Sequence, residues 1–221
     1  MAKHAVYAER NDEYYKGFNY VTLRNRLHEI MKKEPNDLYR LIISLYIDNP
    51  VRRTSDYTKM LINEKDNGKD NLLIFTKHKK QFVYNYWKNS AKVGTQTHTI
   101  TNTNAIKTIQ EYLNNHPDNK YLLENEDGSS LTETQVETRI AYIAKKNKLQ
   151  SVFSVNSIRH LLATYIDSED YSDKMKKQIA VTIGSSVAML ERHYIDNKPE
   201  DIAVEFLENP KKKKNRERKN K

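Results

Sequence analysis

Four short segments of this 221-residue chain carry residue types that could act together on a phosphate group. They are PVRRTSDY (50–57), YWKNSAKVG (86–94), NSIRH (156–160) and GSS (184–186), the last followed by Tyr194. Arginine suits phosphate because its planar guanidinium stays charged and matches two oxygens at once. Attack on a phosphodiester also needs a nucleophile and an acid for the leaving oxygen. If the fold brings these segments together, they predict chemistry on a phosphodiester.

Other kinds of catalytic site have little support in the sequence. The chain has no cysteine, which excludes disulfides, thiol nucleophiles and thiolate zinc sites. The seven histidines lack paired i, i+4 placement, and no carboxylate cluster has metal-ligand spacing. No GxxxxGK[ST] motif is present, so a nucleotide-driven motor is not indicated. We therefore expect no metal and no cofactor, and a metal nuclease is the weaker interpretation.

The positive charge is concentrated at the C-terminus. The formal net charge is +9, and the last twelve residues carry eight Lys or Arg and one Glu, which leaves +2 for the rest. Such a tail attracts phosphates without regard to sequence, and this attraction weakens with salt. The alternatives are a solvated disordered tail or a nuclear-import signal.

The first sixty residues predict helices. An amphipathic helix is expected within 1–36, and a buried helix is expected to begin at Asp37, which can cap it, and to end at Asp48-Asn49-Pro50. A further helix is expected to start within residues 51–61.

The middle of the chain predicts a small sheet and the rest predicts helices. Three β-like runs at 71–75, 81–87 and 95–100 indicate a three-stranded antiparallel sheet, with Gly94 in the last hairpin. Helical stripes follow, with Thr132 and Gln135 placed as a capping box and Ser154 as a cap. The remaining helices are expected at 173–183, 186–195 and 199–208. The fold class is therefore α+β and mainly helical.

The four segments, in this order and at these separations, resemble the catalytic domain of tyrosine recombinases. The resemblance is in particular to the compact integrases of virophages and large DNA viruses, and it spans residues 37–208. It leaves residues 1–36 as an N-terminal helical extension or the remnant of a core-binding domain, and 209–221 as a basic disordered tail.

The resemblance assigns a role to each segment. Tyr194 would be the nucleophile that forms a 3′-phosphotyrosine, and Arg53 and Arg159 would hold the phosphate. Lys88 would protonate the leaving 5′-oxygen, with Lys92 on the same turn as its rival. We also expect Arg52 and Lys92 to contact DNA.

Arg53 is preferred to Arg52 because the family has an acidic residue three positions after this arginine. Asp56 stands there, and helical spacing would let it fix the stem of Arg53. His160 follows the second arginine, as is common in the family.

Two positions depart from the family pattern. Asn156 stands where the family has histidine, and Ser185 stands where the family has histidine or tryptophan. Both can hydrogen-bond a phosphate oxygen, but neither accepts a proton near neutral pH. His160 or His193 could assist instead, and the alternative is a catalytically weakened DNA-binding relative.

The resemblance implies a site-specific recombinase, or integrase, that acts on double-stranded DNA and assembles as a tetramer. It implies an intracellular location in the host cytoplasm, nucleus or viral factory, because neither a secretory signal nor a membrane span is expected. Two alternatives stay open: a type IB topoisomerase-like enzyme, and a DNA-binding module without catalysis.

Overall fold

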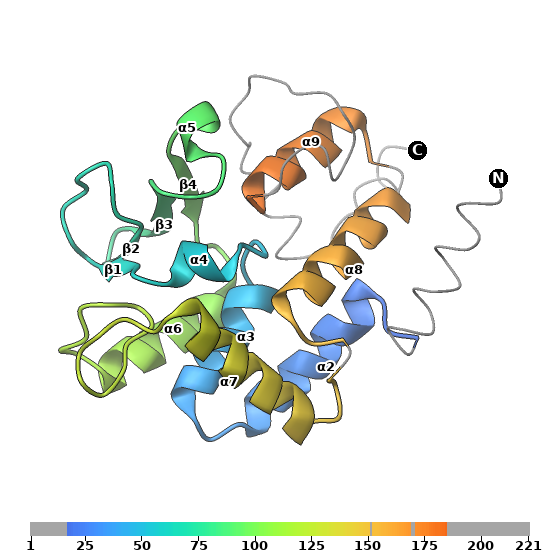
Figure 1. Ribbon diagram of the computed structural model, residues 1–221, viewed down its shortest axis with the longest axis horizontal. Helices are drawn as coiled ribbons and strands as arrows, with labels where there is room; N and C mark the ends of the chain where they lie inside the picture. Colours follow the sequence, from blue (N-terminus) through green and yellow to red (C-terminus); the bar gives the residue numbers. More distant parts are fainter. Residues whose placement is uncertain (1–16, 151, 169–170, 185–221) are drawn as a thin grey trace.

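The computed structural model describes residues 17–150, 152–168 and 171–184 (Figure 1). The helices are α2 (Tyr20–Lys33), α3 (Asp37–Ile47), α4 (Thr54–Tyr57), α5 (Ser90–Val93), α6 (Thr103–Asn115), α7 (Glu133–Lys146), α8 (Val155–Ser168) and α9 (Asp173–Thr182). The strands are β1 (Leu61–Ile62), β2 (Leu72–Phe75), β3 (Lys80–Tyr84) and β4 (Gln96–Thr99). The helices predicted at 186–195 and 199–208 and the basic tail lie outside the described residues.

The two N-terminal helices form where the apolar periodicity places them. Asn19 caps α2 through a reciprocal pair of bonds with Thr22, each 2.9 Å long. Asn36, and not Asp37, caps α3, because its side chain accepts from the amide of Tyr39 at 3.0 Å. The cap residue must be extended, and Asn36 is extended whereas Asp37 is already helical.

The helix predicted to start within residues 51–61 is only one turn long. It ends after Tyr57, and Lys59 adopts a left-handed backbone with φ of 59°. A left-handed residue breaks a right-handed helix. The chain then pairs Leu61 and Ile62 with β2 as a short strand.

The sheet has four strands in the order β1-β2-β3-β4, and not three. The predicted strands are confirmed in place, and β2, β3 and β4 pair antiparallel. The additional strand β1 runs parallel to β2, so the sheet is mixed. A two-residue strand has no periodicity of its own, which is why the sequence did not reveal it.

The connection between the last two strands is longer than predicted and contains a short helix. Strand β3 ends at Tyr84, and the chain passes through the short helix α5 before β4 begins at Gln96. Gly94 ends α5 with φ of 82°, a conformation that favours glycine.

The C-terminal helices have the predicted caps. Thr132 and Gln135 form the capping box of α7. The hydroxyl of Ser154 accepts from the amide of Ser157 at 3.1 Å and so caps α8. Helix α9 begins after Ser172, which caps it in the same way.

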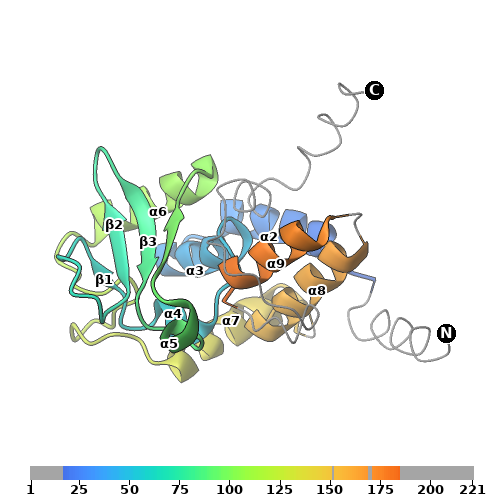
Figure 2. The ribbon, with the colours of Figure 1, turned by 90° about the horizontal axis from the view of Figure 1, so that it is seen from above.

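One hydrophobic core joins the sheet and the helices. Leu23 and Leu27 of α2 belong to the same buried cluster as Leu41 of α3 and Ile158 of α8. The helix inside the expected N-terminal extension therefore packs directly on the helices that follow it. Figures 1 and 2 show the sheet at one end of the molecule and α2, α8 and α9 at the other, with α3 and α4 between them.

Across the described ranges, no helix is both long enough and apolar enough to span a bilayer.

Candidate phosphate-binding site

Three of the residues predicted for the site line one pocket of about 590 Å³. They are Arg53, Asn156 and Arg159, from the start of α4 and the first turns of α8. Helix α7 supplies the opposite wall, with Glu133, Glu137 and Lys145 among its side chains. The pocket thus brings together two arginines from distant parts of the sequence.

Arg159 is buried and fixed on one side only. Its Nη1 donates to the carbonyl oxygens of Val51, at 2.5 Å, and Ile183, at 2.6 Å. Its Nη2 is buried and has no acceptor within the described part of the chain. A buried N–H without a partner is costly, so Arg159 retains a donor suited to an anion.

Positive charge accumulates around Arg159. Burial, and then the neighbouring charges of Arg53 and Arg52, lower the pKa of Arg159 to about 10. Arg159 therefore still carries its charge at neutral pH, in an environment that disfavours it. A bound phosphate would supply the missing negative charge.

Arg53 is half-buried, and its Nε also lacks an acceptor among the residues described. The expected pairing of Arg53 with Asp56 is wrong, because Asp56 binds Arg52 through Nε and Oδ2 at 2.9 Å. Arg53 is the cap residue of α4 with an extended backbone (φ −72°, ψ 156°), so the helical i, i+3 rule does not apply to it. Arg53 is thereby left without the carboxylate that the sequence suggested for it.

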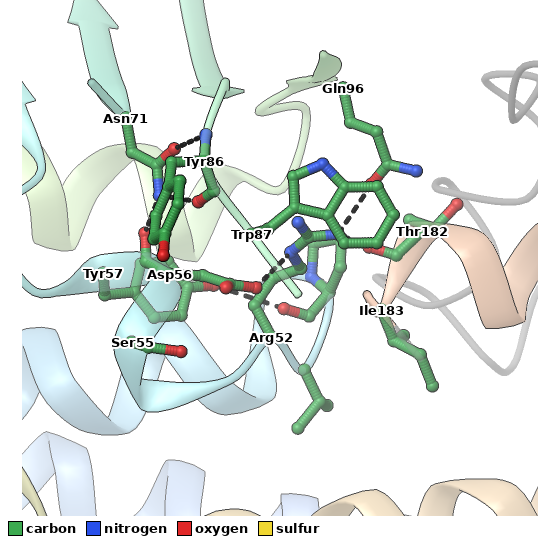
Figure 3. Close-up of polar contacts among 12 residues, drawn as sticks. Arg52, Ser55, Asp56, Tyr57, Asn71, Tyr86, Trp87, Gln96, Thr182 and Ile183 are labelled. Carbon is green, nitrogen blue, oxygen red and sulfur yellow. Dashed lines mark hydrogen bonds and ion pairs between the residues drawn. The ribbon is translucent and has the colours of Figure 1, made fainter. Parts of the chain in front are cut away.

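Arg52 lies in the interior, so the expectation that it contacts DNA is wrong for this structure. Its Nη1 donates to Gln96 Oε1 at 2.7 Å and to the carbonyl of Thr182 at 3.0 Å (Figure 3). Its guanidinium carbon lies 4.0 Å from the ring centroid of Tyr84 and 4.9 Å from that of Trp87. A run of two arginines is usual on a basic surface, and only the Asp four residues later hinted at a buried pair.

Lys88 and Lys92 are both exposed in the connection between β3 and β4. Neither is among the residues that line the pocket. Trp87, directly before Lys88, is buried, and its indole N–H donates to the carbonyl of Gly94 at 3.1 Å. The connection is thus anchored next to Lys88, and the choice between the two lysines stays a prediction.

The remaining predicted residues fall into two groups. Asn156 and His160 are exposed on α8, and of the two only Asn156 lines the pocket. Ser185, His193 and Tyr194 follow Gly184 and lie outside the described residues. The roles proposed for them are therefore predictions from the sequence.

Three other tyrosines surround Asp56, and all are sealed in the core. Burial raises the pKa of Tyr46, Tyr57 and Tyr84 well above 10. The hydroxyl of Tyr57 is committed to the carbonyl of Pro50 at 3.2 Å. These three phenols are poorly suited to attack a DNA strand, since the ionised nucleophile is disfavoured there.

Among the described residues, no three His, Asp or Glu side chains lie close enough together to hold a metal ion.

No protein-family model and no curated protein sequence matches the chain. By its structure, however, the chain has the fold of the tyrosine recombinase catalytic domain, a mainly helical domain with a small mixed sheet. One solved structure that the chain resembles is the crystal structure of XerA recombinase, with a TM-score of 0.52 and 18% sequence identity. The alignment covers 77% of this chain, which spans 58% of that structure. At this identity the likeness establishes the fold.

Proposed function

We propose that this chain is a site-specific DNA recombinase that cleaves and rejoins DNA through a 3′-phosphotyrosine at Tyr194. The observation that carries the proposal is the meeting of Arg53 and Arg159 in one pocket, each with an N–H that has no acceptor in the described protein. Two poorly compensated guanidinium groups form a receptor for one phosphate. The fold, which tyrosine recombinases share, supports the same interpretation.

In the proposed reaction, the phenolic oxygen of Tyr194 forms a bond to the phosphorus of the scissile phosphate. The bond from phosphorus to the 5′-oxygen breaks, and Lys88 supplies the proton that this oxygen takes up. Arg53 and Arg159 stabilise the negative charge that develops on the non-bridging oxygens. The phosphodiester is exchanged for a phosphotyrosine ester, so the 5′-hydroxyl of another strand can reverse the step without an energy source.

Asn156 contributes a hydrogen bond in this scheme and no proton transfer. Its amide can donate to a phosphate oxygen from the pocket wall, but it accepts no proton near neutral pH. The proton of Tyr194 must therefore pass to His160, His193 or solvent. Recombination further requires four protomers on two DNA sites, and this self-association is part of the proposal.

The two pocket arginines provide the test. We expect Arg53→Gln and Arg159→Gln each to slow strand cleavage by about 10²–10³-fold, because each removes a charged donor to the phosphate in the transition state. The measurement is single-turnover cleavage of a nicked suicide duplex in EDTA. Arg139→Gln is the matched control, because Arg139 lies on α7 and donates to the carbonyl of Gln135 in its own helix.

Equal cleavage rates for Arg159→Gln and Arg139→Gln would reject the phosphate-binding role of the pocket. Cleavage that depends on added Mg²⁺ would instead favour a nuclease.

A further inference from the structure

Arg52 is the largest side chain that the fold buries completely in the described part of the chain. Its contacts come from five separate segments. They are Asp56 of α4, Tyr84 of β3, Trp87 of the following connection, Gln96 of β4, and Val181 and Thr182 of α9. Figure 3 shows the guanidinium of Arg52 among Asp56, Trp87, Gln96 and Thr182.

A buried guanidinium is stable only when its charge is paired and its N–H groups are bonded. Asp56 supplies the charge at 2.9 Å from Nε, and Gln96 and Thr182 accept from Nη1, whereas Nη2 has no acceptor among the described residues. The rings of Tyr84 and Trp87 add cation–π contacts on the apolar side. Because the arrangement needs all of these groups at once, it fixes the five segments relative to one another.

One end of this network leads to Lys88. Trp87 directly precedes Lys88 and is buried against Arg52. A second tie holds the same stretch, because Asn71 Nδ2 donates to the carbonyls of Asp56 and Tyr86, both at 2.9 Å, while Asn71 Oδ1 accepts from the amide of Tyr86 at 2.8 Å (Figure 3). The chain entering Lys88 is therefore joined to α4 by two independent sets of contacts.

The other end of the network leads towards Tyr194 in the sequence. Arg52 bonds the last carbonyls of α9, and Gly184 follows with φ of 62°. A Cβ at Gly184 would lie 3.0 Å from both Cζ and Nη1 of Arg52, so the backbone passes against the guanidinium itself. Ser185 and the segment that ends at Tyr194 begin from this point.

We propose that Arg52 is a positioning residue that couples the segment bearing Lys88 to the start of the segment bearing Tyr194. Arg52 touches no substrate. It acts by holding Lys88, the acid, and Tyr194, the nucleophile, in position relative to the pocket of Arg53 and Arg159. This inference rests on the proposed function. It differs from a purely stabilising role, because it predicts that catalysis suffers while DNA affinity is retained.

The test uses a double variant, Arg52→Met with Asp56→Asn. Arg52→Met alone would leave Asp56 buried and unpaired, whereas the double variant removes both charges at similar volume. Arg52→Lys is the second variant, because it keeps the charge but has no fork to bond Gln96 and Thr182 together. Arg40→Met is the matched control, since Arg40 also bonds two carbonyls, those of Glu34 and Pro35, outside this network.

Four quantities are measured on the 221-residue protein. Circular dichroism reports whether each variant is folded. Acrylamide quenching reports the burial of Trp87, which is the only tryptophan of the chain. Affinity for a duplex and single-turnover adduct formation on the suicide duplex are then determined separately.

We expect the folded double variant to form adduct about 10- to 100-fold more slowly, as is typical when reacting groups are misplaced. Its affinity for DNA should change by less than about threefold, because the phosphate contacts that bind the ground state remain. Trp87 should become more open to quenching, and Arg52→Lys should be intermediate in both rate and quenching. Arg40→Met should match the wild type in both.

An unchanged rate in the folded double variant, or equal losses of rate and affinity, would overturn the positioning role. If the double variant does not fold, a wild-type rate in Arg52→Lys would overturn it as well. A wild-type protein that forms no adduct would refute the proposed function. The role of Arg52 in holding the segment before Lys88 would then be tested by acrylamide quenching of Trp87 alone. Increased quenching in the double variant would support that role, and unchanged quenching would overturn it.

Discussion

At the scale of single residues, the site depends on how charge is divided between two adjacent arginines. Arg52 pairs with the carboxylate of Asp56 and is buried with it, whereas the carboxylates of Glu133 and Glu137 line the pocket of Arg53 and Arg159. Arg53 keeps an Nε without an acceptor in the described chain and lines the same pocket as Arg159. The positive field that could hold a phosphate exists because one arginine is neutralised and the other two are not.

This division could not be read from the sequence, because it depends on where α4 begins. With α4 starting at Thr54, both arginines precede the helix; Arg53 is its cap, and the side chain of Arg52 pairs with Asp56. A start one or two residues earlier would have joined Arg53 to Asp56 in the expected way. Helix boundaries are the least certain part of any prediction from sequence.

Gly184 permits a prediction at the same scale. We expect Gly184→Ala to lower the free energy of unfolding by about 2–3 kcal/mol, from a left-handed backbone and from crowding of Arg52. The control is Gly128→Ala, which has φ of 79° but nothing within 4 Å of the added Cβ, and should lose only about 1 kcal/mol. Urea denaturation of the two variants measures the difference, and equal losses would show that Arg52 does not press on Gly184.

At the scale of elements, the sequence predicted what periodicity encodes. The long helices have apolar spacing that fits one buried face, and the strands β2 to β4 formed where the β-like runs predicted them. The short elements β1, α4 and α5 were missed or misjudged. Their positions are set by side chains such as Asn71, which bonds the backbone of segments far away in the sequence.

Asn71 therefore offers a prediction for the junction of α4 with the segment after β3. We expect Asn71→Ala to lower the free energy of unfolding by about 2–3 kcal/mol, since it leaves the buried carbonyl of Asp56 and two part-buried backbone groups of Tyr86 without this partner. The control is Asn67→Ala, because Asn67 makes its turn bonds on the exposed surface and should lose less than about 1 kcal/mol. Thermal and urea melts compare the two, and similar losses would contradict the bridging role of Asn71.

At the scale of the whole molecule, the pocket is a product of topology. Arg53 precedes the sheet and Arg159 follows α7, yet α3, α7 and α8 pack so that both reach one cavity. Sequence order indicated these residues through a family resemblance, and the fold explains how they meet. The resemblance did not predict that Arg52 is buried or that it links α9 to the sheet through Thr182 and Gln96. Both features depend on side-chain contacts within this chain.

The basic C-terminus gives a prediction about DNA binding as a whole. We expect neutralising the eight Lys and Arg of residues 210–221 to weaken binding to any duplex. It should also flatten the dependence of log affinity on log salt, by about 0.9 for each phosphate that the tail no longer neutralises. Titrations over a range of salt concentrations measure this slope. An unchanged slope would show that the tail does not bind DNA. That result would not test the proposed binding of phosphate by Arg53 and Arg159.

The central claim is that Tyr194 exchanges a DNA phosphodiester for a phosphotyrosine held by Arg53 and Arg159. Its most direct test is incubation of the 221-residue protein with a nicked suicide duplex in EDTA, denaturation in SDS, and gel analysis for a protein–DNA adduct. Wild type should give a 3′-linked adduct that maps to the peptide containing Tyr194, and Tyr194→Phe should give none while still binding the duplex. An adduct that persists in Tyr194→Phe, or no adduct from wild type on a duplex that it binds, would contradict this account.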